Sequence, residues 1–274
     1  MANVMDQFSL DGRTALVTGA AGLLGRQFTR VLGQAGASIV AADLDIESAE
    51  QQAQALREEG MSALGLKVDI TDPHSVETMV SSAAAEFGRL DILVNSAAMD
   101  PKFDPENLDA QSANAFETFP LEAWQQAVDV NLTGMFLACQ GAARQMVRQN
   151  SGVIINICST YGLVGPDQRL YERPDGPQQF KPVYYSVTKA GVLGLTRYLA
   201  TYYAGKPIRV NALTPGGIFN QHDDVFLKGY SARTVLGRMA SQDEMNGAIV
   251  FLASDASSYM TGANLVVDGG WTAW

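Results

Sequence analysis

The chain has 274 residues, of which 47% are hydrophobic and 18% are charged, so it can bury a sizeable core and is not disordered throughout. Its formal net charge is −10 and it contains no run of basic residues, which argues against a nucleic-acid partner.

Apolar β-rich runs alternate with helical patterns along most of the chain. In chain order we predict a strand at 14–18, a helix at 22–35, a strand at 38–42, a helix at 46–59, a strand at 63–68, a helix at 72–87, a strand at 90–95, a helical stretch at 121–148, a strand at 153–158, a helix at 184–203, and strands at 208–213 and 264–267.

Strands that are apolar on both faces and separated by helices predict a parallel sheet. Right-handed crossovers then give a doubly wound, Rossmann-like α/β fold with helices on both faces. We expect a single domain over residues 1–274, with inserted loops near 100–120 and 165–182.

The two cysteines and two histidines show no metal-ligand or disulfide pattern. Cys139 and Cys158 lie in apolar stretches, and His74 and His222 stand apart, so we expect no metal site. The first residues lack a basic region followed by an apolar run, and the apolar stretches are too short to span a bilayer. We therefore expect a cytoplasmic protein with no membrane partner.

A glycine-rich turn joins the first predicted strand to the first predicted helix. It contains Gly19, Gly22, Leu24 and Gly25. A diphosphate must approach the backbone closely, and the helix start offers free N–H groups and a partial positive charge. The turn therefore predicts a dinucleotide site, although glycines also occur in ordinary turns.

Asp43 ends the second predicted strand, where a ribose-binding carboxylate is expected in such folds. It would accept hydrogen bonds from the adenosine ribose and repel a 2′-phosphate. Arg26 comes only after the turn, inside the helix, so no arginine is placed to bind that phosphate. We predict NAD rather than NADP; the alternative is that Asp43 only caps the strand end.

Further motifs follow the glycine turn in a fixed order. They are Asp69 after the third predicted strand, Asn95-Ser96-Ala97-Ala98 after the fourth, Asn131, Ser159 after the fifth, Tyr185 with Lys189, Pro215-Gly216-Gly217, and the segment from Phe251 to Gly270. Each motif alone is weakly specific. Together, over nearly the whole chain, they resemble the compact single-domain branch of the short-chain dehydrogenase/reductase family.

That resemblance implies an NAD-dependent oxidoreductase that transfers a hydride between nicotinamide and a carbinol or carbonyl carbon. Tyr185 would be the acid/base, and Lys189, four residues later, would lower its pKa and hold the nicotinamide ribose. Ser159 would bind the reacting oxygen, and Asn131 would anchor a water that links Lys189 to solvent. Without the other motifs, such a Tyr–Lys spacing is also common on helix surfaces.

The resemblance also implies a larger set of cofactor residues. Asp69 is expected near the adenine, Asn95 at the adenosine side and in the sheet, and Ala97 through its backbone. The full set is Gly19, Gly22, Leu24, Gly25, Asp43, Asp69, Ile70, Asn95, Ala97, Tyr185, Lys189, Pro215, Gly216 and Ile218.

Some positions depart from the family pattern. Leu23 stands where the compact branch has glycine, a spacing typical of the extended branch, but the long C-terminal region of that branch is missing. Ser96 and Ala98 replace the usual residues of their segment. Asn220 stands near the position where a threonine often binds the carboxamide.

Both inserted loops follow strands at their C-terminal ends, where doubly wound folds bind ligands, so we expect them to border a substrate pocket. The second is polar and carries Arg169, Arg173 and Lys181. We therefore predict a polar small-molecule substrate, such as a sugar, an amino sugar or a phosphate-bearing derivative, contacted by Ser159, Tyr161, Arg169 and Arg173. The chain is also similar to short-chain dehydrogenases of bacterial surface-glycan and sialic-acid-like sugar pathways; the alternative is that the loops form subunit contacts.

Other functions stay open on the same fold. They are reduction of a 3-oxoacyl or simple ketone substrate, sugar epimerisation or dehydration that recycles NAD, and NAD sensing without catalysis. Trp271 and Trp274 lie within the last four residues, which favours a buried interface over a free end, so we predict a homotetramer or homodimer.

Overall fold

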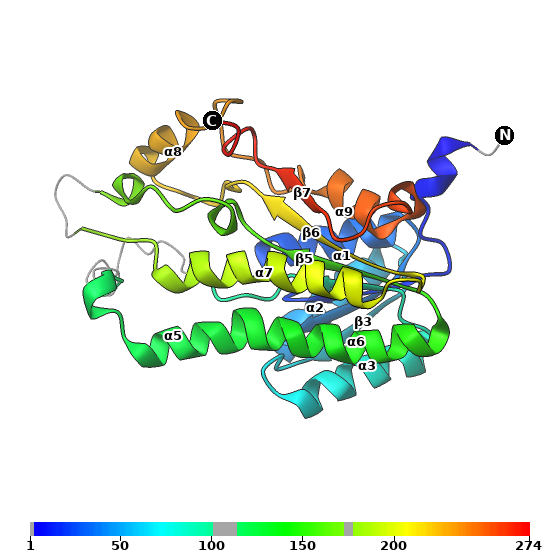
Figure 1. The fold of residues 1–274 in the computed structure, drawn as a ribbon. Coiled ribbons are helices and arrows are strands. Elements are labelled where there is room, and N and C mark those ends of the chain that lie inside the picture. Colours follow the sequence, from blue (N-terminus) through cyan, green and yellow to red (C-terminus); the bar gives the residue numbers. More distant parts are fainter. Residues whose placement is uncertain (1–2, 101–113, 173–177) are drawn as a thin grey trace.

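A seven-stranded parallel sheet forms the centre of the protein in the computed structural model, which describes residues 3–100, 114–172 and 178–274 (Figure 1). Its strand order is β3-β2-β1-β4-β5-β6-β7, and every neighbouring pair is parallel. The strands are β1 Thr14–Thr18, β2 Ser38–Asp43, β3 Ala63–Lys67, β4 Ile92–Asn95, β5 Gly152–Ile157, β6 Ile208–Pro215 and β7 Asn264–Val267. This confirms the predicted Rossmann-like α/β fold.

The sheet is covered by helices on both faces (Figure 1). On one face pack α1 (Leu23–Gln34), α2 (Ile46–Glu58) and α9 (Asn246–Ala253), and on the other α3 (Pro73–Phe87), α6 (Met135–Gln149) and α7 (Val183–Tyr202). Strand β1 is buried along its length: Leu16 faces the second set, while Ala15 and Val17 face the first. A strand buried on both faces is the expected partner of two apolar helix layers.

Helix α3 begins as its sequence predicts. The Asp72 carboxylate accepts hydrogen bonds from the backbone N–H groups of His74 and Ser75, and Pro73 occupies the first turn, where its missing N–H is not needed. Gly88 ends the helix in the left-handed conformation, with a φ of +76°.

The long helical stretch predicted at 121–148 is divided. Helix α5 (Leu121–Val128) passes through a π-helical segment, Asp129–Gly134, into α6. Helix α8 (Asp224–Ser231) was not predicted. It is short, and its start is fixed by Asp223, whose side chain accepts a hydrogen bond from the Phe226 N–H.

Among the helices that the structure describes, none is both long enough and apolar enough to cross a bilayer. Residues 101–113 and 173–177, which fall within the two predicted inserts, lie outside the described residues.

Candidate active site

The carboxyl ends of the parallel strands bring most of the predicted site residues to one edge of the sheet. Gly19 follows β1, Asp43 ends β2, Asn95 ends β4, Ser159 comes shortly after β5, and Pro215 ends β6. The order of the strands reverses between β1 and β4, and doubly wound folds bind their ligands at the strand ends beside such a reversal.

The glycine turn after β1 has no room for side chains at two positions. Gly19 has a φ of +67°, and a Cβ there would lie 2.8 Å from the Ala97 Cα. A Cβ on Gly25 would lie 2.0 Å from the Gly19 carbonyl oxygen. Gly22 precedes α1 and supplies no capping side chain, so the first N–H groups of the helix face the turn without one. The turn therefore fits a diphosphate group.

Asp43 lies against this turn. Its Oδ2 accepts a hydrogen bond of 2.9 Å from the Ala21 N–H, which links the end of β2 to the turn after β1. The side chain is half-buried, so a carboxylate stands beside the diphosphate cradle, as the ribose-binding prediction requires. The contact with the ribose itself stays a prediction.

Asp69 and Ile70 follow β3. The Asp69 Oδ1 accepts hydrogen bonds from the Thr71 hydroxyl at 2.6 Å and from the Thr71 N–H at 2.9 Å. These bonds, the hydroxyl first, hold the pKa of Asp69 below its ordinary value, so the carboxylate stays charged. Ile70 is buried beside Gly134, at the end of the π-helical segment.

Asn95 is turned into the sheet. Its buried amide donates to the Asn156 Oδ1 at 2.8 Å and to the Cys139 Sγ at 3.1 Å. Of the two roles predicted for Asn95, its side chain serves the sheet. Ala97, by contrast, lies against Gly19, and its N–H donates to the Thr18 hydroxyl at 3.3 Å.

The segment after β6 is held from two sides. The Gly216 N–H donates to the Val267 carbonyl at 2.9 Å, and Ile218 forms a parallel bridge with Ala240. These contacts fix the segment from Pro215 to Ile218 at the same edge of the sheet as the glycine turn, where its predicted cofactor contacts require it.

Tyr185, Ser159 and Lys189 come together as predicted. The Tyr185 hydroxyl lies close enough to the Ser159 side chain for that side chain to lower its pKa, and the Ser159 Oγ accepts from the Tyr161 N–H at 3.2 Å. Lys189 lies one helical turn after Tyr185 on α7, with its Nζ 5.9 Å from the centre of the Tyr185 ring. The same Nζ donates to the Ile157 carbonyl at 2.9 Å.

The pKa of Tyr185 is raised well above its ordinary value, mainly because the hydroxyl is buried. The nearby Asp100 carboxylate raises it further, and the hydrogen bond from Ser159 opposes the change. Burial also lowers the pKa of Lys189. In the protein by itself burial sets the direction of the Tyr185 pKa, and the predicted lowering by Lys189 stays a prediction.

Asn131 lies in the π-helical segment and uses its side chain as a clamp. Its Oδ1 accepts from the Met99 N–H at 2.7 Å, and its amide donates to the Met99 carbonyl at 3.1 Å and to the Thr188 hydroxyl at 3.2 Å. It therefore holds the segment after β4 against α7. Its predicted link to a water stays a prediction.

The described ends of the two inserts meet at α7. From the first, Phe119 packs its ring against Tyr184, with centres 5.8 Å apart. From the second, the Lys181 ammonium lies 4.0 Å from the centre of the Tyr185 ring and 2.7 Å from the Asp100 Oδ1. The sequence showed Lys181 only as one cation of a polar loop.

Arg169 lies apart from this cluster in its described contacts. Its guanidinium pairs with Asp167 at 2.8 Å, and its side chain is 76% exposed. Asp167 also pairs with Arg233. The cation of the second insert that lies over Tyr185 is Lys181. Arg173, the other predicted substrate cation, lies outside the described residues.

An aromatic cluster packs beside Tyr185. Trp271 stacks on Tyr230 with ring centres 4.2 Å apart, and Tyr161 meets both Trp271 and Tyr185 edge-on. Trp271 is thus packed within its own chain, and the predicted homotetramer or homodimer stays a prediction. Trp274 stays 79% exposed, although its Nε1 donates to the Arg233 carbonyl.

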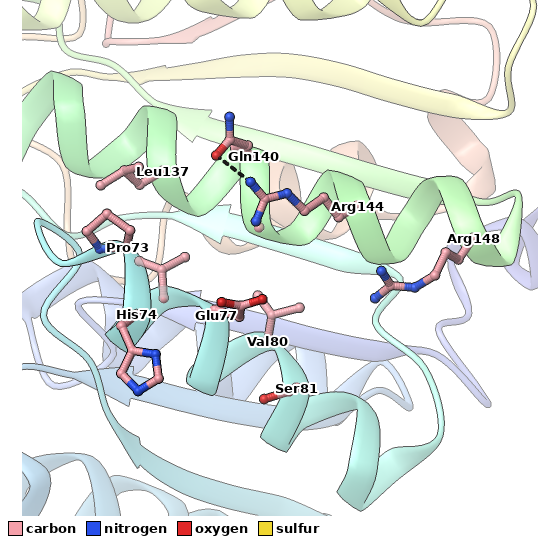
Figure 2. A pocket seen from close by; sticks show the side chains of 11 residues that line it. Pro73, His74, Glu77, Val80, Ser81, Leu137, Gln140, Arg144 and Arg148 are labelled. Carbon is pink, nitrogen blue, oxygen red and sulfur yellow. Dashed lines mark hydrogen bonds between the residues drawn. The ribbon is translucent and has the colours of Figure 1, made fainter.

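A separate surface hollow of about 470 Å³ lies between α3 and α6 (Figure 2). His74, Glu77 and Arg144 line it, and Arg144 donates to Gln140 at 2.9 Å. The described residues that line the hollow include none of the predicted catalytic residues, so it is distinct from the site at the strand ends.

Several known proteins resemble this chain over nearly its whole length. The cis-4-hydroxycyclohexanecarboxylate dehydrogenase of Sinomonas cyclohexanicum is 39% identical over 95% of this chain and 97% of its own length. The D-threitol dehydrogenase of Mycolicibacterium smegmatis is 36% identical over 97% of this chain and 95% of its own. The crystal structure of a gluconate 5-dehydrogenase from Burkholderia cenocepacia, with NADP and tartrate, superposes with a TM-score of 0.84 at 32% identity, covering 99% of this chain and all of that one.

A family model for short-chain dehydrogenases, described as Enoyl-(Acyl carrier protein) reductase, matches residues 19–272. The match spans the glycine turn, the Ser159–Tyr185–Lys189 cluster and the C-terminal strand. The chain therefore belongs to the short-chain dehydrogenase/reductase family.

Proposed function

We propose that the protein is a nicotinamide-dependent oxidoreductase that interconverts a secondary alcohol and a ketone on a polar small molecule. The observation that carries this proposal is the grouping of Tyr185, Ser159 and Lys189 at the sheet edge that also holds the glycine turn. The names of the relatives support the substrate class, because hydroxycyclohexanecarboxylate, threitol and gluconate are all polar alcohols.

The residues of the chain supply the proton path of this reaction. The nicotinamide, when bound, supplies or accepts the hydride. For reduction, the Ser159 hydroxyl and the Tyr185 hydroxyl would bind the substrate carbonyl oxygen, and Tyr185 would donate its proton as that oxygen becomes a hydroxyl. For oxidation Tyr185 would accept the proton, and the nearby Lys189 ammonium would stabilise the tyrosinate.

Turnover across a substrate panel tests the proposed function. Formation of NADH or NADPH would be followed by absorbance with cis-4-hydroxycyclohexanecarboxylate, D-threitol, D-gluconate, an amino sugar, a 3-hydroxyacyl thioester and 2-propanol. We expect turnover among the first four. Turnover of the thioester alone would favour the acyl alternative. Hydride exchange without net formation of reduced cofactor would favour epimerisation or dehydration. Cofactor binding without any turnover would favour a sensor.

We also propose that the protein prefers NAD to NADP. A structural relative holds NADP, so this preference needs its own test, and replacement of Asp43 provides one. A carboxylate beside the turn would repel a 2′-phosphate, so we expect the wild type to bind NADH more tightly than NADPH. Asp43→Asn should tighten NADPH binding by about 10-fold or more and weaken NADH binding, because the ribose hydroxyls lose a charged acceptor. Fluorescence titration of both cofactors measures this.

Asp45→Asn is the matched control, because Asp45 caps α2 two residues later and asparagine caps helices equally well. It should leave both affinities unchanged. Equal affinity of the wild type for NADH and NADPH would contradict the preference for NAD.

A further inference from the structure

Lys181 places a largely buried positive charge at the catalytic tyrosine. Its side chain is 12% exposed, and its Nζ lies 4.0 Å from the centre of the Tyr185 ring. Gln168 fixes the backbone of Lys181, because its side chain accepts from the Lys181 N–H at 2.9 Å and donates to the Lys181 carbonyl at 3.1 Å. The ammonium is therefore held in place over the ring.

Lys181 forms an ion pair with Asp100, a residue that is distant in the sequence. The Asp100 Oδ1 lies 2.7 Å from the Lys181 Nζ, and the two residues are 81 positions apart. Although Lys181 is largely buried, the Asp100 side chain is 57% exposed. An exposed partner contributes little to stability, so it can be exchanged for another anion at small cost.

The Asp100 carboxylate lies among the hydroxyl groups of the site. Its charge contributes to raising the pKa values of Tyr161, Tyr171, Tyr184 and Tyr185, although burial is the larger cause in each case. A negative charge thus already stands beside the place where a substrate must sit to reach the Tyr185 hydroxyl.

The second insert also holds an unsatisfied polar group close to Lys181 in the sequence. The Gln179 side chain is buried, and within the described part of the chain neither its amide nitrogen nor its carbonyl oxygen has a hydrogen-bond partner. A buried polar group that stays unpaired is unfavourable, so a polar ligand that supplied a partner for Gln179 would stabilise this segment.

We propose that Lys181 binds the carboxylate of a hydroxy-acid or keto-acid substrate, and that the Asp100 carboxylate occupies this position until the substrate displaces it. The exchange conserves charge, because one carboxylate leaves the ammonium as another arrives. This inference rests on the proposed function, since the substrate oxygen at Tyr185 and the carboxylate at Lys181 belong to one molecule. Carboxylate binding by Lys181 would restrict the polar substrates of the proposed reaction to hydroxy acids and keto acids.

Binding of unreactive probes tests this without turnover. Isothermal titration of the NADH-saturated protein with cyclohexanecarboxylate, and with neutral cyclohexanecarboxamide, would compare the wild type with Lys181→Met and Asp100→Asn. We expect Lys181→Met to weaken carboxylate binding by about 10- to 100-fold. Asp100→Asn should tighten it by about 2- to 5-fold, because the internal competitor is gone. The affinity for the carboxamide should change little in either variant.

Lys206→Met is the matched control, because Lys206 is exposed just before β6, at the opposite edge of the sheet. It should bind the carboxylate as the wild type does. Circular dichroism and NADH titration confirm that each variant is folded, and Asp100→Asn tests the inference even if Lys181→Met does not fold.

Three results would overturn the inference: no carboxylate binding by the wild type, equal weakening of both probes in Lys181→Met, or weaker carboxylate binding in Asp100→Asn. Turnover of neutral polyols combined with any of these leaves the proposed function intact. Carboxylate binding that depends on Lys181, without turnover of any alcohol, would instead count against the proposed function alone.

Discussion

Replacing Tyr185 with phenylalanine is expected to lower kcat by about 10²- to 10⁴-fold, the usual contribution of a positioned acid/base group. The loss should fall on the chemical step, because the ring remains to pack against Tyr161 and Lys181 while the hydroxyl near Ser159 is gone. Steady-state kinetics on a substrate found in the panel, together with NADH titration, would measure it. Cofactor affinity should change little.

Tyr184→Phe provides the control. Tyr184 precedes Tyr185 and is also buried, but its ring packs on Phe119, and burial raises the pKa of its hydroxyl to about 12. We expect its removal to change kcat only a few-fold. A Tyr185→Phe variant with close to wild-type kcat would show that another group supplies the proton.

The raised pKa of Tyr185 also determines how the rate depends on pH. At neutral pH the hydroxyl is protonated, which is the form that donates a proton during reduction. Reduction should therefore be constant through neutral pH and fall only in alkali, whereas oxidation needs the tyrosinate and should rise with pH. Profiles of kcat/KM against pH in both directions would show this. The fall of the reduction rate in alkali and the rise of the oxidation rate with pH should both be absent from the residual activity of Tyr185→Phe.

Gly25→Ala is expected to have the second large effect, on cofactor binding and stability together. The new methyl group would lie 2.0 Å from the Gly19 carbonyl oxygen and 2.8 Å from the Ala20 Cα, and both are backbone atoms that cannot swing away. We expect the free energy of unfolding to fall by about 1–3 kcal/mol and NADH binding to weaken by about 100-fold or more, since the turn must open.

Urea unfolding and NADH titration would measure the two effects separately. Gly247→Ala is the matched control, because Gly247 lies in α9 and a Cβ there meets no atom within 4 Å. Alanine favours a helix more than glycine does, so this variant should be as stable as the wild type or up to about 1 kcal/mol more stable. Normal NADH binding by Gly25→Ala would rule out the close diphosphate approach.

The fold followed from local pattern, because neighbouring residues determine where buried strands and helices begin. The strand predicted at 38–42 extends to Asp43, and the strand predicted at 208–213 extends to Pro215. The roles of Ser159, Tyr185 and Lys189 came instead from the resemblance to the short-chain dehydrogenase/reductase family, while the common ends of parallel strands and the helical spacing of Tyr185 and Lys189 are consistent with their proximity.

The substrate side could not be placed in this way. Lys181 stands before α7, with Pro182 at the helix start, so helical spacing does not apply, and Gln168 sets its position. The aromatic cluster collects Tyr161, Tyr230 and Trp271 from distant segments, and no short-range pattern connects them. For the same reason the sequence could not show that Trp271 packs on Tyr161 and Tyr230 of its own chain.

The central place of β1 has a consequence for how the protein is made. Strand β1 leaves the ribosome early, yet one of its neighbours, β4, is synthesised only after β2, α2, β3 and α3. Gly19 packs on Ala97, which follows β4, so the nucleotide cradle cannot close until that strand has inserted beside β1. A nascent chain that ends before β4 therefore exposes one apolar edge of β1, and we expect chaperone contact and aggregation risk to be greatest in that interval.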